Sequence, residues 1–91
     1  MSEVKNLSEV VEEVITKLCE ESEREYFSRY KVAQIINYIL RDHELKTIKE
    51  QMIYNYCRND MIQTVEVNSK LMINYEELVR FSVKYLSKKI K

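Results

Sequence analysis

The side chains with the most distinctive chemistry fall on one predicted helix, residues 47–58. At helical spacing, five of its polar side chains share one face, here called the reading face: Thr47, Gln51, Tyr54, Asn55 and Arg58. Gln, Asn and Arg are the side chains that form paired hydrogen bonds with the edges of adenine and guanine. The pattern therefore indicates a helix that enters the groove of a nucleic-acid duplex, but these residues are also common on an ordinary solvated helix.

The elements around this helix are predicted from hydrophobic periodicity and capping signals. Thr47 and Glu50 form a T-x-x-E capping box, which predicts that the helix begins at Thr47. A preceding helix is predicted over residues 28–41, and only residues 42–46 separate the two. Two helices joined by a short polar link have the layout of a helix-turn-helix, although any helical hairpin has the same layout. The predicted inward side chains of the preceding helix are Val32, Ile35, Ile36, Ile39 and Leu40.

After Asp60 the apolar residues alternate with polar ones, which indicates strands. We expect a two-stranded hairpin over residues 64–67 and 70–73, because Asn68 and Ser69 separate the strands and Asn tolerates the left-handed backbone of a tight turn. Asn74 and Glu77 form a second capping box and predict a helix from Tyr75 to residue 88 or 89. The expected fold class is therefore mainly α with a small β-hairpin.

Length and composition set limits on both architecture and function. The 91 residues suffice for one domain, predicted over residues 7–91, after a disordered N-terminus at residues 1–6. A first amphipathic helix is expected from Leu7 to about Glu23, with Ser8 as its cap. The chain contains no Gly and no Pro, so it lacks the glycine-rich loops that cradle phosphates in the usual nucleotide-binding enzymes.

The residue inventory offers little for catalysis. The one histidine, His43, lies between Asp42 and Glu44 with no partner for a triad or a metal site nearby in the sequence. We therefore expect no enzyme activity, no cofactor, no metal and no small-molecule ligand. Cys19 and Cys57 are predicted to be reduced thiols in helices. With no signal peptide and no long apolar run, the expected location is the cytoplasm, without membrane contact.

The net charge of zero conceals an uneven distribution. Residues 1–25 hold three basic and eight acidic residues, a net charge of −5, whereas residues 26–91 hold twelve basic and seven acidic residues, a net charge of +5. The predicted reading face therefore belongs to a basic body that carries an acidic first helix. The isoelectric point near 6.6 is nevertheless low for a protein that binds nucleic acid.

The run MIYNYCRNDMIQTVEVNSKLMINYEELVRFSVKYL resembles small winged helix-turn-helix proteins of the excisionase and MerR type. It is equally similar to winged-helix regulators and partition proteins of archaeal plasmids and viruses. On this resemblance, YKVAQII from Tyr30 is the first helix of the motif, and Ile53, Cys57 and Ile62 are inward anchors. Asn68, Ser69 and Lys70 are the tip of the wing. The excisionase and MerR-type proteins usually carry Gly where this chain has Asp60, and often Gly and Arg in the wing.

The first functional hypothesis is a homodimer that binds double-stranded DNA as a transcriptional regulator, plasmid partition protein or excisionase-like protein. Gln51, Asn55 and Arg58 are then expected to contact bases, and Lys70 the flanking backbone or minor groove. The full set of expected DNA contacts is Lys46, Thr47, Lys49, Gln51, Tyr54, Asn55, Arg58, Asn68, Ser69 and Lys70. The dimer interface is expected on the wide apolar surface of the last helix, at Leu78, Phe81, Tyr85, Leu86 and Ile90. The alternative is a protein-interaction adaptor or inhibitor on the same scaffold that does not bind DNA.

Overall fold

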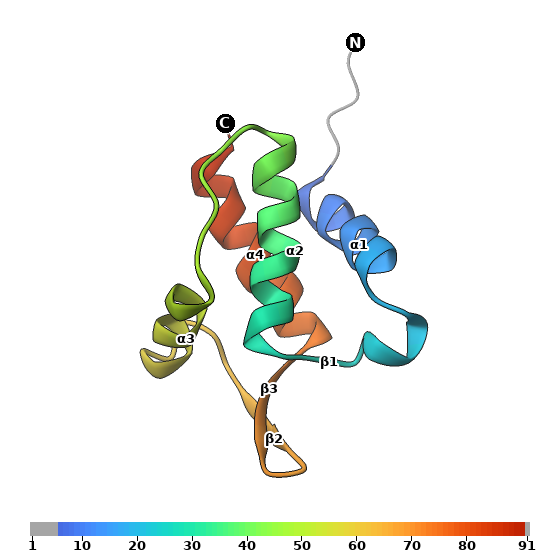
Figure 1. Ribbon diagram of the computed structural model, residues 1–91, viewed down its shortest axis with the longest axis vertical. Coiled ribbons are helices and arrows are strands. Elements are labelled where there is room, and N and C mark those ends of the chain that lie inside the picture. The colour runs from blue at the N-terminus through green and yellow to red at the C-terminus, as the bar shows by residue number, and fades with distance from the viewer. Residues whose placement is uncertain (1–5, 91) are drawn as a thin grey trace.

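The computed structural model describes residues 6–90, which form four α-helices, one short 3-10 helix and a three-stranded antiparallel sheet (Figure 1). The predicted class, mainly α with a small β-hairpin, is confirmed at that level. Most of the predicted disordered segment, residues 1–5, lies outside the described residues. The elements in chain order are α1 (Leu7–Leu18), η1 (Glu21–Glu23), β1 (Tyr26–Phe27), α2 (Arg29–Asp42), α3 (Glu50–Arg58), β2 (Val65–Val67), β3 (Lys70–Asn74) and α4 (Tyr75–Lys89).

Helix α1 is shorter than predicted and has a different cap. Asn6 stands at the N-cap, where its Oδ1 accepts hydrogen bonds from both the backbone N–H and the hydroxyl of Ser8, so Ser8 is not the cap. The helix ends at Leu18 rather than near Glu23. The acid-rich residues that follow form η1 instead, in which Glu20 and Glu23 make a reciprocal capping box.

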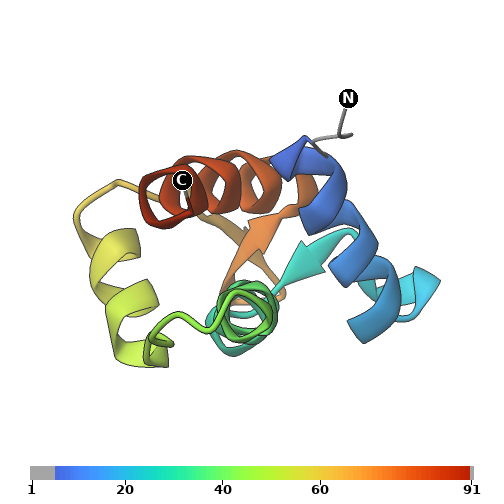
Figure 2. The ribbon, with the colours of Figure 1, turned by 90° about the horizontal axis from the view of Figure 1, so that it is seen from above.

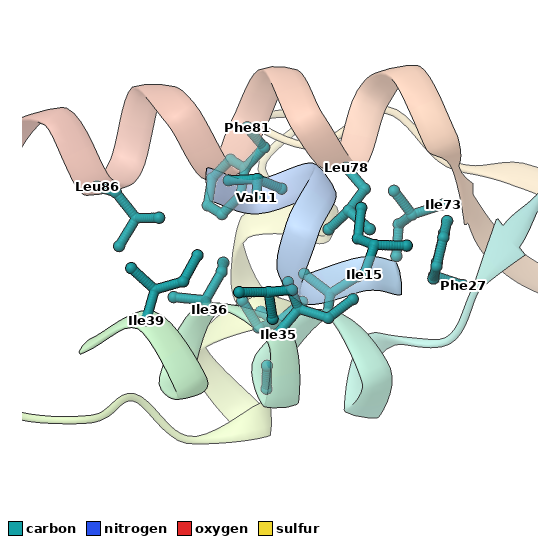
Figure 3. Packing of buried hydrophobic residues seen from close by; sticks show 14 of the residues in the cluster. Val11, Ile15, Phe27, Ile35, Ile36, Ile39, Ile73, Leu78, Phe81 and Leu86 are labelled. Carbon is teal, nitrogen blue, oxygen red and sulfur yellow. The ribbon is translucent and has the colours of Figure 1, made fainter. Parts of the chain in front are cut away.

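One hydrophobic cluster joins α1, α2 and α4 with the sheet (Figure 3). The five residues predicted to face inward from α2 are all buried, and Ser28 caps this helix by accepting from the Lys31 N–H at 3.1 Å. Ile35 and Ile36 of α2 meet Val11 and Ile15 of α1 and Leu78 of α4 within the cluster. The sheet adds Phe27 and Ile73 at one end.

The predicted hairpin is confirmed, and it gains a strand that the sequence pattern did not reveal. β2 and β3 pair across Asn68 and Ser69, whose φ angles of 51° and 67° give the tight turn its left-handed backbone. β1 pairs with the other edge of β3 through Tyr26↔Asn74 and Phe27↔Ile73, so the sheet order is β1-β3-β2. A strand of two residues is too short to show alternation in a sequence.

Helix α3 begins at Glu50 rather than at Thr47, and the predicted capping box does not form. Lys49 occupies the N-cap position and makes no side-chain cap bond. The cause lies on α2, where the side-chain amide of Asn37 makes two 2.8 Å hydrogen bonds to the backbone of Ile48, one to its N–H and one to its C=O. These bonds hold Ile48 in the extended link between α2 and α3, with its side chain buried.

Helix α4 is capped by Asn74 as predicted, because Asn74 Oδ1 accepts from the Glu77 N–H at 2.8 Å. Its apolar surface is used differently from the prediction. Leu78, Phe81 and Leu86 are buried within the chain's own core, so they are not available to a partner subunit. Of the five predicted interface residues, Tyr85 and Ile90 keep partial exposure.

Candidate functional site

The ten residues predicted to contact DNA are all exposed. Gln51, Tyr54, Asn55 and Arg58 lie on α3, and Asn68, Ser69 and Lys70 form the tip and first strand residue of the β2–β3 hairpin. Lys46 and Thr47 lie on the extended link that precedes α3 rather than on the helix itself. Thr47 therefore does not belong to the reading face, which consists of Gln51, Tyr54, Asn55 and Arg58 of α3. Met52 of α3 is also exposed, at 41%.

Two amides of the reading face are already paired with each other. The Gln51 Nε2 donates to Asn55 Oδ1 at 3.3 Å, because residues four apart stand one above the other on a helix. This bond leaves three side-chain groups for an external partner: one Nε2 hydrogen of Gln51, the side-chain carbonyl oxygen of Gln51, and the NH₂ group of Asn55. The two side chains therefore present a joined row of donors and acceptors along α3.

Tyr54 is the centre of a cationic cluster that the sequence did not reveal. The Arg29 guanidinium lies 4.6 Å from the Tyr54 ring centroid, and the Arg58 guanidinium lies 5.9 Å from it. Both distances are within the range of cation–π attraction, so the ring helps to hold two positive charges beside the reading face. Arg29 is the first residue of α2. Its outward position was predictable, but its approach to α3 depends on how the two helices pack.

The β2–β3 hairpin borders the same surface as Arg29 and the start of α3. A hollow of about 330 Å³ is lined by Arg29 of α2, Glu50 of α3 and Lys70 of β3, together with neighbouring residues. Next to the hollow, Leu71 is 59% exposed. The start of α2, the start of α3 and the hairpin base therefore meet in one place, and Glu50 contributes the acidic side chain there.

The inner side of α3 is anchored to the core and to α4. Ile53 is fully buried, and the ring of Tyr56 packs against Phe81 with 5.2 Å between centroids. Asp60, which follows α3, has a φ of 61°, a left-handed backbone that Gly adopts most readily. Asp tolerates this conformation better than most residues, so the absence of Gly does not prevent the turn.

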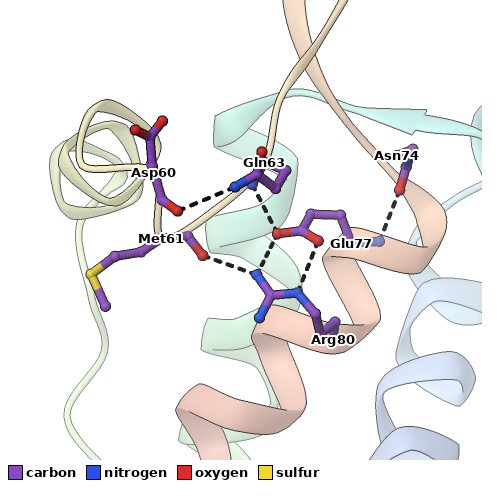
Figure 4. A network of polar contacts seen from close by, with 6 residues as sticks. All are labelled: Asp60, Met61, Gln63, Asn74, Glu77 and Arg80. Atoms are coloured by element: carbon purple, nitrogen blue, oxygen red, sulfur yellow. Dashed lines mark hydrogen bonds and ion pairs between the residues drawn. The ribbon is translucent and has the colours of Figure 1, made fainter.

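A polar network fixes the loop between α3 and β2 onto α4 (Figure 4). Glu77 accepts a 2.8 Å hydrogen bond from the Gln63 backbone N–H and forms an ion pair with Arg80. Arg80 also donates to the Met61 carbonyl at 3.0 Å. Glu77 was predicted as the capping-box partner of Asn74, but its carboxylate bonds to this loop instead.

The charge asymmetry seen in the sequence is also a spatial one. Figure 2 shows α1 and α3 on opposite sides of the molecule, with α2 and α4 between them. Glu9, Glu12 and Glu13 of α1 are exposed on the side away from α3, whereas Arg29, Arg58 and Lys70 gather at or near the reading face. An anionic partner is therefore attracted to the α3 side and repelled from the α1 side.

Comparisons with protein-family models, with curated proteins and with solved structures found no match for this chain.

Three further properties concern the two thiols, metal-binding groups and membrane-spanning helices. Both cysteines are free, and burial raises the pKa of the Cys19 thiol and of the half-buried Cys57 thiol. A raised pKa lowers the fraction of each thiol that is present as the reactive thiolate at neutral pH. Within residues 6–90 no group of three or more His, Cys, Asp or Glu side chains is placed to hold a metal ion. None of the helices over those residues has the length and apolar character that crossing a membrane requires.

Proposed function

We propose that this chain is a winged helix-turn-helix protein that binds double-stranded DNA sequence-specifically, as a homodimer inside the cell. α2 and α3 would be the helix-turn-helix, with α3 in the major groove and the β2–β3 hairpin as the wing. The observation that carries the proposal is the convergence of the reading face, the Arg29–Tyr54–Arg58 cluster and Lys70 on one side. The acidic helix α1 lies on the opposite side of the molecule.

Each group of residues then has a distinct role. Gln51, Asn55 and Arg58 contact base edges and determine the preferred sequence, because their paired donors and acceptors match purines. Lys49 and Lys70 contact phosphates, and Arg29 joins them as a residue that the sequence did not predict. Phosphate contacts position the protein on the duplex without selecting its sequence.

The test is a fluorescence-anisotropy titration with DNA selected from a random pool. Gln51→Ala and Arg58→Ala should each weaken binding by about 1 to 3 kcal/mol and relax the preference at one base position. Lys70→Ala should instead weaken binding to all sequences and lower the slope of log K against log salt by about 1. Arg41→Ala, at the exposed C-terminal turn of α2, is the matched control. The reading face is wrongly assigned if Gln51→Ala and Arg58→Ala bind the selected DNA within twofold of the parent chain.

A homodimer would use the part of α4 that the core leaves exposed. Val79, Val83 and Ile90 share one face of α4, where they pack against the edge of the core and stay partly exposed. A two-fold dimer joined there predicts an inverted-repeat DNA site with half-sites about one helical turn apart. Footprinting that reveals a single asymmetric contact region contradicts the two-fold arrangement.

The alternative function is an adaptor or inhibitor that contacts other proteins through the same scaffold. The near-neutral isoelectric point of 6.6 and the carboxylate of Glu50 beside the reading face favour it. A DNA titration at two salt concentrations separates the two functions, because counterion release gives a DNA-binding protein a steep salt dependence. An adaptor shows neither saturation nor a salt slope.

A further inference from the structure

A hollow of about 650 Å³ lies between the C-terminal part of α3, the loop that follows it and the face of α4 that carries Phe81, Lys84 and Tyr85. Gln51 is not among its lining residues, and it shares no lining residue with the hollow lined by Arg29 and Lys70. Pockets that hold small molecules in proteins have volumes of roughly 300 to 1,000 Å³. Its size therefore suits a ligand of drug-like or metabolite dimensions.

The floor of this hollow is aromatic. Tyr56 of α3 and Phe81 and Tyr85 of α4 line it, with centroid separations of 5.2 Å for Tyr56–Phe81 and 5.9 Å for Phe81–Tyr85. Tyr56 and Tyr85 meet edge to face at 6.2 Å. Three rings in mutual contact hold one another in place and offer a preformed surface for a flat apolar group.

The rim of the hollow is basic. Arg80, Lys84 and Lys88 follow one another at intervals of four residues, so they form a single row along α4, and the Lys89 ammonium lies 5.5 Å from the Tyr85 ring centroid. Asp60 is the one carboxylate among the lining residues, which leaves a net charge of +3. Because Arg80 is occupied by Glu77 and the Met61 carbonyl, the lysines are the cations best placed to meet an anion.

We propose that this hollow is a binding site for a small amphipathic anion. The flat apolar part of the ligand lies on the rings of Tyr56 and Tyr85, and its carboxylate, sulfonate or phosphate is bound by Lys84 and Lys88. A second copy of the chain fits this place poorly in a two-fold arrangement, because the rows of lysines would then face each other and repel. The sequence had suggested no ligand of this class, since the site forms only when α3 packs beside α4.

The position of the site gives it a regulatory consequence, which rests on the proposed DNA-binding function. Tyr56 lies between Asn55 and Arg58 in the chain, but on the opposite side of α3. A ligand that presses on Tyr56 therefore contacts the helix from behind the reading face. Coupling between two such sites changes affinity by about 5- to 150-fold in typical cases, and the change is reciprocal.

The binding test needs no DNA and uses 8-anilinonaphthalene-1-sulfonate, a flat aromatic anion, as the probe. We expect saturable binding at one site per chain, with amide NMR shifts centred on α4 and the end of α3. The Lys84→Ala/Lys88→Ala double variant should bind the probe at least tenfold more weakly. Lys17→Ala/Arg41→Ala removes the same charge from other surfaces and should leave binding unchanged, as should Leu71→Ala, which removes an exposed apolar side chain elsewhere.

Three outcomes would overturn the proposal. The first is probe affinity that the Lys84/Lys88 variant leaves unchanged while its thermal melt matches that of the parent chain. The second is equally tight binding of the uncharged analogue N-phenyl-1-naphthylamine, which would show that the rim plays no part. The third is loss of probe binding as the protein self-associates at high concentration, which would assign the hollow to a second copy. Each result is independent of DNA affinity, so failure here is distinguishable from failure of the proposed function.

Discussion

The Glu77 carboxylate shows how much one side chain contributes to the positioning of α3. The ion pair with Arg80 and the hydrogen bond from the Gln63 N–H lower the pKa of Glu77, although its partial burial acts in the opposite direction. Since the Arg80 side chain is 48% exposed, the ion pair itself is worth about 0 to 1 kcal/mol. The greater structural effect is that Glu77 and Arg80 join α4 to the loop that follows α3.

Glu77→Gln should lower the free energy of unfolding by about 1 kcal/mol at neutral pH, because the ion pair is lost while an amide oxygen remains to accept from Gln63. A folded-state pKa below the ordinary value of 4.5 means that the contribution of Glu77 is complete above that value. It is lost as the pH falls through the lowered pKa. Urea unfolding of both proteins between pH 7 and pH 3 should therefore converge toward the acidic end. Glu76→Gln, on the same turn but exposed, is the control.

At the scale of elements, the link between α2 and α3 determines where the reading face starts. The side-chain amide of Asn37 hydrogen-bonds both the N–H and the C=O of Ile48, as a neighbouring strand would. These two bonds keep the link extended. The polar residues of the link therefore precede α3 instead of forming its first turn. This arrangement separates Lys46 and Thr47 from the face formed by Gln51 and Asn55.

Asn37→Ala should destabilise the fold by about 2 to 3 kcal/mol, because it removes two hydrogen bonds and leaves two partly buried backbone groups unpaired. It should also weaken DNA binding through the looser attachment of α3, without changing the salt slope, since no phosphate contact is lost. Thermal unfolding and the anisotropy titration measure the two effects. Asn59→Ala, which changes an exposed asparagine, should have a much smaller effect on both; equal losses in the two variants would argue against the role of Asn37.

Sequence patterns predicted the elements that carry a strong local signal and missed the features that depend on distant contacts. α2, α4 and the β2–β3 hairpin were recognisable because several turns of apolar spacing, or a turn with Asn68, specify them locally. The start of α3 was misplaced because a capping box at Thr47 and Glu50 competes with a long-range contact from Asn37 that no local pattern contains. β1 and Arg29 were missed for the same reason, since each depends on a partner far away in the sequence. The aromatic floor under α4 likewise joins residues from two elements.

At the scale of the whole molecule, the core and the surface of α4 compete for the same apolar residues. Leu78, Phe81 and Leu86 of α4 are used in the chain's own core. What remains for association is the flank with Val79, Val83 and Ile90. A homodimer interface on this flank is narrower than the sequence suggested.

Val83→Glu should convert the proposed dimer to a monomer, because a buried carboxylate at the centre of that flank has no partner. Sedimentation equilibrium should report twice the 11.0 kDa chain mass for the parent protein and a single chain mass for the variant. Asn59→Glu adds the same charge at an exposed position after α3, outside α4, and should remain dimeric. A parent chain that sediments as a monomer at every concentration would remove the two-fold model, but not DNA binding by one copy.

The placement of α1 opposite α3 gives the molecule a permanent electric dipole. In the field of a polyanion, such a molecule rotates before collision, so a larger share of encounters begins with α3 foremost. Added salt shortens the range of this electrostatic attraction. It should therefore lower the association rate more than it raises the dissociation rate. On the proposed DNA-binding function, the carboxylates of the first helix would orient the approach to DNA without contacting it.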